Sequence, residues 1–267
     1  MMSKALSRIY VGLVYLFLYA PIAVLIIFSF NSSKSRNVWT GFTFDWYLKL
    51  FNNETIISSL FNTLLVAAVS SVVATVIGTA AAVGIHAMNK NLRAAVVNVT
   101  YLPVINPEIV TGVSLMLLFV FVGVKLGFTT LIIAHITFNV PYVILNVIPK
   151  LRQMDSHLYE AAQDLGCDPA KAFFRVVIPE IMPGIITGFL MAFTYSIDDF
   201  VISYFTSGPS SQTLPITIFS MTRKKVSPEI NALSAIIFVI VLVILILMNI
   251  KDSNIYRKRI KKEAERI

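Results

Sequence analysis

The chain has 267 residues, of which 57% are hydrophobic and 13% charged, with a net charge of +8 and a mean hydropathy of +0.78. Soluble domains contain roughly 45–50% apolar and about 25% charged residues. This composition therefore excludes an ordinary soluble protein and indicates a multi-pass membrane protein.

Apolar runs of about twenty residues, the length of a membrane-spanning helix, divide the chain into six predicted spans. They cover residues 9–30, 56–88, 96–122, 126–148, 181–205 and 230–250. The first run resembles a signal peptide by position, but its length and the lack of a small-residue cleavage site predict a retained helix. The connecting segments are too short for a soluble domain. We therefore expect an all-α polytopic membrane protein with one transmembrane domain over residues 1–267.

Six spans place both termini on the same side of the membrane. With a cytoplasmic N-terminus, the inner segments hold 15 of the 22 Lys and Arg residues and the outer segments hold 7. The positive-inside rule therefore predicts cytoplasmic N- and C-termini. The basic tail after Ile250 is short and adjoins a span, which favours anionic lipid headgroups over nucleic acid as its partner.

Trp46 and Glu108 are candidate functional residues that each allow two interpretations. Trp46 precedes the second span, where it either meets a protein outside the membrane or anchors at the headgroup level. Glu108 follows Pro103 and Pro107, which predict a break in the third span, and broken membrane helices lie beside cavities. The Glu108 carboxylate either bonds backbone groups exposed by this break or contacts a substrate.

The loop over residues 149–179 carries helix start and stop signals in a clear order. A first short helix is predicted to end before Gly166, which suits the left-handed position after a helix. Asp168, followed by a proline, is a typical start for a second helix. Pro179 is predicted to end that second helix, near residue 178.

Within this loop, Glu160-Ala161-Ala162 is followed after three residues by Gly166, and nine residues later by Val-Val-Ile-Pro over 176–179. The pattern resembles the EAA loop of the membrane subunits of ATP-driven, binding-protein-dependent importers, whose own pattern ends in Ile-x-Leu-Pro. The resemblance implies the type I ABC importer permease fold with six transmembrane helices. It also implies a coupling loop that docks on an ATPase subunit through Glu160, Ala161, Ala162, Gly166 and Pro179.

The chain has no G-x-x-x-x-G-K-[ST] segment to hold phosphates. We therefore expect that this chain is not an enzyme and binds no cofactor. The resemblance implies that the partner ATPase binds ATP and Mg²⁺. The three histidines lack metal-ligand spacing, and no Ser, His and acid constellation is evident. Neither a metal site nor a catalytic site is expected.

Two segments in the last third of the chain indicate one branch of this importer family. The segments Phe-Thr-Tyr-Ser-Ile-Asp-Asp-Phe over 193–200 and Ser-Pro-Glu-Ile-Asn-Ala over 227–232 resemble the second permease subunit of the spermidine/putrescine branch of that family. The resemblance implies a bacterial inner-membrane importer of polyamines with a sister permease, an ATPase dimer and an extracytoplasmic polyamine-binding protein. Iron, sulfate and molybdate importers share the EAA loop, so another small solute is an alternative substrate. A secondary cation transporter or channel is a second alternative.

Asp198 and Asp199 are the outstanding candidates for contact with such a substrate. Acids inside a membrane are costly and usually face a cavity or a partner. Because consecutive helical residues point about 100° apart, the two carboxylates are expected to have different roles. Aromatic walls attract ammonium groups. The predicted substrate pathway contains Asp198, Asp199, Glu108, Tyr195, Ser196 and Trp46, and the alternative is that the two aspartates only cap or pair structurally.

Overall fold

The computed structural model describes residues 4–33, 38–155, 157–224, 228–240, 242–243 and 246. The regular elements in these ranges are helices, together with one isolated β-bridge between Asn31 and Phe42. The chain divides into two compact units. Unit 1 comprises Met1–Glu54 and Ser220–Ile267, and unit 2 comprises Thr55–Phe219. One transmembrane domain over the whole chain stays a prediction.

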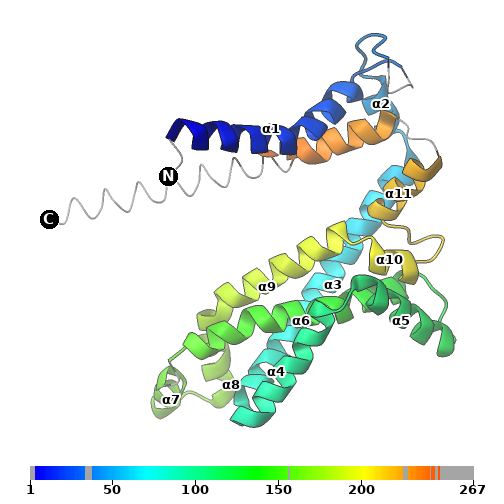
Figure 1. Ribbon diagram of the computed structural model, residues 1–267. Helices are drawn as coiled ribbons and strands as arrows, with labels where there is room; N and C mark the ends of the chain where they lie inside the picture. Colours follow the sequence, from blue (N-terminus) through cyan, green and yellow to red (C-terminus); the bar gives the residue numbers. More distant parts are fainter. Residues whose placement is uncertain are drawn as a thin grey trace. The chain divides into compact units, whose positions relative to one another are not determined.

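Unit 1 contains the long apolar helix α1 (Lys4–Ser29), the short helix α2 (Asp45–Phe51) and a helix over Pro228–Ile240 (Figure 1). Helix α1 covers most of the first predicted span. The sixth predicted span, 230–250, begins in the Pro228–Ile240 helix, and its remainder lies almost entirely outside the described residues, as does the basic tail.

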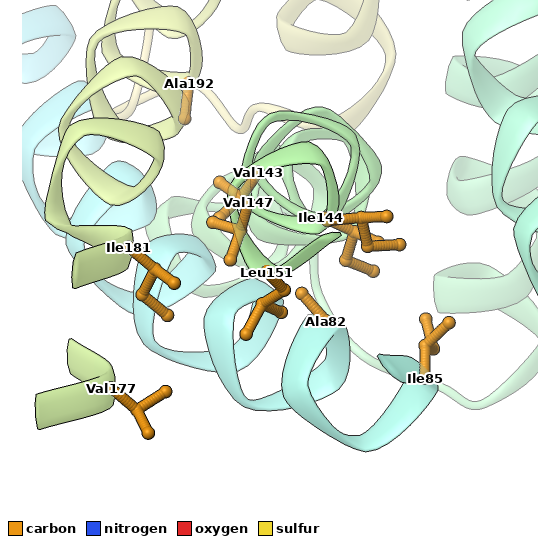
Figure 2. Packing of buried hydrophobic residues seen from close by; sticks show 10 residues of the cluster. Ala82, Ile85, Val143, Ile144, Val147, Leu151, Val177, Ile181 and Ala192 are labelled. Carbon is orange, nitrogen blue, oxygen red and sulfur yellow. The ribbon is translucent and has the colours of Figure 1, made fainter. Parts of the chain in front are cut away.

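Unit 2 is built around α3 (Glu54–Ala87), α6 (Phe128–Gln153) and α9 (Ile178–Asp198), with α6 packed along α9 (Figure 1). Aliphatic side chains from these helices, and from the residue just before α9, form its main core (Figure 2). The members are Ala82, Ile85, Val143, Ile144, Val147, Ile148, Leu151, Val177, Ile181 and Ala192. This core holds the last turns of α3 and α6 and the start of α9 together.

The third predicted span is broken where the prolines predicted a break. Helix α4 (Lys90–Ile105) and helix α5 (Glu108–Phe121) meet at 98°. In the described ranges, four helices are long and apolar enough to cross a membrane, and counting this bent pair as one span makes five. The six-span count stays a prediction.

The fifth predicted span, 181–205, was expected to be continuous, and this expectation is wrong. Helix α9 ends at Asp198, and a separate helix α10 (Val201–Thr206) follows. Asp199 has an extended backbone, and its carboxylate accepts the N–H groups of Ile202 and Ser203 at 3.1 and 2.7 Å. The side chain thus starts a new helix instead of continuing the old one.

The expectation that Pro179 ends the second loop helix is also wrong. Helix α8 (Pro169–Ala172) continues through a π-helical turn, Phe173–Val177, directly into α9. In this turn the Ile178 N–H donates to the Phe173 carbonyl, five residues back. Pro179 then occupies the first turn of α9, where its missing N–H costs little.

The remaining elements are α7 (His157–Asp164) and α11 (Leu214–Lys224).

Candidate functional site

In the loop between α6 and α9, the turn at Gly166 and the cap at Asp168 have the local structure that the sequence predicts. Gly166 has φ of +84°, and its N–H donates to the Gln163 carbonyl at 2.8 Å, which closes the end of α7. The Asp168 carboxylate accepts the Ala170 N–H at 3.2 Å and caps α8. Left-handed backbone is costly for residues with a Cβ, so glycine is required by the turn itself.

One side of this loop is anchored and the other is open. Tyr159 and Phe173 pack against the core of unit 2. Leu165 and Phe174 are 87% and 68% exposed. Large apolar side chains that a fold leaves exposed are typical of a surface that a partner protein or a membrane covers.

The predicted coupling residues belong to this open loop surface. Glu160, Ala161 and Pro179 are exposed, and Ala162 is half-buried. The Glu160 carboxylate lies 3.5 Å from the His157 ring on the same exposed side of α7. The small side chains of the two alanines leave the α7 backbone open to close approach.

Two exposed carboxylates lie where the broken helices meet. Glu108 is the first residue of α5 and Asp198 is the last residue of α9. Both are exposed, and they are near enough to interact electrostatically. Helix α5 also packs against α10, with Gly112 against Phe205. The two breaks therefore bring acids from distant parts of the sequence into one cluster.

Aromatic rings border this acidic cluster. The rings of Tyr142 and Tyr195 have centroids 4.5 Å apart, and Phe138 lies 5.2 Å from Tyr142 and 6.2 Å from Tyr195. Tyr142 also lies within electrostatic range of Glu108. Carboxylates with aromatic faces beside them attract organic cations through charge and cation–π interactions.

A cavity of about 560 Å³ lies at the α4–α5 break. Phe138 lines this cavity and also contacts the rings of Tyr142 and Tyr195. Pro107, another lining residue, directly precedes Glu108. Its lining is Leu102, Pro103, Ile105, Asn106, Pro107, Thr111, Ser114, Leu115, Thr137 and Phe138. A cavity therefore lies beside the break in this helix, as the two prolines predict.

Ser196 lies in a buried polar network instead of facing the cavity. Its hydroxyl is 3.1 Å from His135 Nδ1 and 3.1 Å from the Ser70 hydroxyl, and it accepts from Asn139 Nδ2 at 2.7 Å. All four residues are buried. Helices α3, α6 and α9 are thereby joined by hydrogen bonds at one level.

Asp199 belongs to the same network and differs from Asp198, as their adjacent positions predict. Its side chain is buried, and one carboxylate oxygen lies 3.5 Å from His135 Nε2. The same ring nitrogen is 3.0 Å from the Ser203 hydroxyl. Asp199 thus holds the α9–α10 break, and Asp198 presents its charge outward.

Trp46 is located in unit 1 and is only 4% exposed. Its indole N–H donates to the Asn31 carbonyl at 2.7 Å, and the Lys49 ammonium lies 4.5 Å from its ring centroid. The described structure therefore gives Trp46 a packing position under the loop that follows α1.

Sequence reasoning missed Tyr142 and the joining role of His135. Tyr142 follows Phe138 by four residues, so one helical face carries both rings, and this spacing was the signal that could have identified it. For His135, the sequence indicated only that the three histidines lack metal-ligand spacing. Its two partners, Ser196 and Ser203, are 61 and 68 residues away in the sequence, which no local pattern indicates.

Replacing His135 with alanine should lower the thermal midpoint of the purified protein by several degrees. The change removes the ring nitrogens beside the Ser196 hydroxyl, the Ser203 hydroxyl and one Asp199 oxygen. Ser196 and Asp199 keep their other hydrogen bonds, so the loss is on the order of 1–3 kcal/mol in total. Thr187→Ala is the matched control, because Thr187 is exposed and bonds only within α9. An equal midpoint for the two variants would contradict a stabilising network.

Comparison with known proteins gives a consistent family and fold. Residues 74–261 match the family described as "Binding-protein-dependent transport system inner membrane component". The chain is 37% identical over 242 residues to the spermidine/putrescine transport system permease protein PotC of Haemophilus influenzae, covering 91% of this chain and 94% of that protein. It is 42% identical over 231 residues to the putrescine transport system permease protein PotI of Escherichia coli K12, covering 83% and 81%.

Two solved structures resemble the fold. One is a bacterial ABC transporter involved in the import of the acidic polysaccharide alginate, with a TM-score of 0.68 and 13% identity over 94% of this chain and 98% of that chain. The other is a bacterial alginate ABC transporter in complex with its pentasaccharide-bound periplasmic protein, with a TM-score of 0.68 and 18% identity over 91% of both chains. At such low identity, these likenesses show a shared fold alone.

Proposed function

This chain belongs to the family of binding-protein-dependent transport system inner membrane components, and we propose that it is the permease subunit of an ATP-driven polyamine importer. The relatives named for spermidine and putrescine transport support this substrate class. The observation in the structure that carries it is the pair of exposed carboxylates, Glu108 and Asp198, beside the rings of Tyr142 and Tyr195. This arrangement suits ammonium groups separated by methylene chains.

We propose different roles for the predicted pathway residues. Glu108 and Asp198 attract the ammonium groups of the passing polyamine, and Tyr195 supplies an aromatic wall. Ser196 and Asp199 are positioning residues, because their buried hydrogen bonds support the end of α9 that carries Asp198. Trp46 supports the loop after α1 and acts on transport only through the position of that loop.

The EAA loop is proposed to couple the passage of the polyamine to ATP hydrolysis. Its exposed side, with Glu160, Ala161, Ala162, Gly166 and Pro179, docks on the ATPase subunit, which binds ATP and Mg²⁺. The anchoring of Phe173 and Val177 in the core supports this role, since a push on the loop then reaches α9 directly.

The proposed assembly contains this chain, a sister permease, a cytoplasmic ATPase dimer and an extracytoplasmic polyamine-binding protein. The chain crosses the bacterial inner membrane six times with cytoplasmic termini, and its sixth span begins in the Pro228–Ile240 helix. The distribution of Lys and Arg residues supports this orientation. A heterodimer with the sister permease completes the pathway.

The substrate proposal predicts that Asp198→Asn and Glu108→Gln each lower spermidine uptake by about tenfold, or about 1.4 kcal/mol. The amides keep the size of the side chains but remove the charge. Uptake is measured in vesicles that contain the complete transporter and its binding protein. Asp198→Glu should be milder, because a negative charge remains.

Glu180→Gln is the matched control, since Glu180 is an exposed acid at the opposite end of α9. Its uptake should equal that of the parent. Stimulation of ATPase activity by binding protein loaded with spermidine, iron or sulfate identifies the substrate class. Parental uptake by both acid variants, or losses that follow the amount of protein, would make these acids structural.

A further inference from the structure

Helix α2 in unit 1 leaves a stripe of large apolar side chains exposed. Phe44, just before the helix, is 59% exposed, and Leu48 and Phe51 are 63% and 64% exposed. Spacings of four and three residues put the three side chains on one side of the helix. Exposed apolar patches of this kind mark a surface covered by a partner or by lipid.

The other two sides of α2 show how the helix is oriented. Trp46 and Leu50 are buried and attach α2 to the rest of unit 1. Asp45, Lys49 and Asn52 form an exposed polar stripe next to the apolar one. A helix with adjoining polar and apolar exposed sides is typical of the boundary between water and a bilayer.

Hydrogen bonds hold α2 at the end of α1 (Figure 1). The Trp46 indole N–H donates to the Asn31 carbonyl at 2.7 Å, and the Tyr47 and Ser29 hydroxyls are 2.6 Å apart. The apolar span Leu6–Ser29 has 24 residues. It is about 36 Å long, against about 30 Å for the hydrocarbon core. When α1 crosses the bilayer, its end therefore reaches the headgroup region and holds α2 there.

The surroundings of α2 fit the same depth. The rings of Phe30, Phe42, Phe44 and Tyr47 form one cluster, with Phe30 lying 5.2 Å from Phe42 and 5.2 Å from Tyr47. Aromatic side chains concentrate at the membrane–water boundary. The exposed Lys49 side chain, on the polar stripe, is long enough to extend its ammonium to lipid phosphates.

We propose that α2 is an interfacial helix that inserts Phe44, Leu48 and Phe51 among the lipid chains at the membrane surface where α1 ends. The occupant of the stripe is the lipid bilayer itself. The proposal rests on α1 crossing the membrane and does not depend on which solute is carried. An interfacial α2 fixes the depth of the loop between α1 and α3.

The test places a fluorescent label at single cysteines of α2. Leu48→Cys, Phe51→Cys and the matched control Asp45→Cys are made in a Cys167→Ser chain and labelled with an environment-sensitive dye. The complete transporter is reconstituted in vesicles of phosphatidylethanolamine and phosphatidylglycerol. A second preparation also contains lipid that is spin-labelled near the headgroup end of its acyl chain.

Labels at positions 48 and 51 should be quenched at least twofold more by the spin-labelled lipid than the label at position 45. Iodide in the water should show the reverse order. Equal lipid quenching at all three positions would overturn the proposal. Shielding of position 48 from both quenchers would assign the stripe to the sister permease. Shielding that develops only when binding protein is added would assign it to that protein, and either result would also overturn a lipid contact.

Discussion

A Gly166→Val subunit should assemble and reach the membrane but lose nearly all transport. The reason is the backbone, since Gly166 has φ of +84° and a Cβ there would meet nothing within 4 Å. An L residue in this conformation costs about 1–2 kcal/mol, and a β-branched one costs more. The strain falls on the turn between α7 and α8, so it should misplace the surface that we propose docks on the ATPase. The measurement is binding-protein-stimulated ATP hydrolysis together with spermidine uptake.

A Gly166→Asn subunit tests whether the loss of transport comes from backbone strain or from any side chain at this position. Asparagine adopts left-handed backbone more readily than valine, so this variant should retain most of the transport. Normal uptake by Gly166→Val at normal abundance would show that the turn is not needed for coupling. Equal losses for valine and asparagine would show that contact with the ATPase, and not φ, sets the requirement for glycine.

A Gly78→Leu subunit should fail to accumulate as folded protein. A Cβ at Gly78 would lie 2.6 Å from the Cβ of Val143 on α6, closer than atoms can approach. Val143 cannot retreat, because a Cβ at Gly188 on α9 would already lie 3.1 Å from its Cα. Extra methylenes in a packed core cost about 1–3 kcal/mol, and a leucine adds four carbon atoms at this close crossing. The measurements are the membrane abundance and the thermal midpoint of the detergent-solubilised protein.

Gly84→Leu on the same helix is the matched control, because a Cβ at Gly84 would meet nothing within 4 Å. This variant should accumulate normally, since leucine is a far better helix former than glycine. Gly78→Ala combined with Val143→Ala should recover part of the abundance that Gly78→Ala loses. If Gly78→Leu and Gly84→Leu accumulate equally, the α3–α6 crossing is looser than this packing implies.

The features that local sequence decides were predicted well. The left-handed turn at Gly166 and the cap at Asp168 follow from backbone preferences that a residue carries into any surroundings. The break before Glu108 follows from the missing N–H of Pro107. The long spans follow from composition, because an unbroken apolar run has few alternatives in a bilayer. The EAA spacing identified the family for the same reason, since it lies within one short segment.

Tertiary structure decided which of two adjacent acids is buried. Asp198 and Asp199 are equivalent in a local pattern, and only the approach of His135 and the start of α10 made Asp199 a buried cap. The Ser70–Ser196 hydrogen bond joins residues that are 126 positions apart. Such contacts depend on how three helices cross, which the spacing of apolar residues does not determine.

The sequence by itself thus determined the long apolar helices, the turn and cap of the loop, and the family, because each depends on neighbouring residues. The tertiary structure decided the continuation of the helix through Pro179, the burial of Trp46 and the close crossing of Gly78 and Gly188 at Val143. A proline is tolerated when a π turn precedes it, and a tryptophan is buried when a distant carbonyl accepts its N–H. Both outcomes depend on packing between segments, so no pattern confined to one segment can encode them.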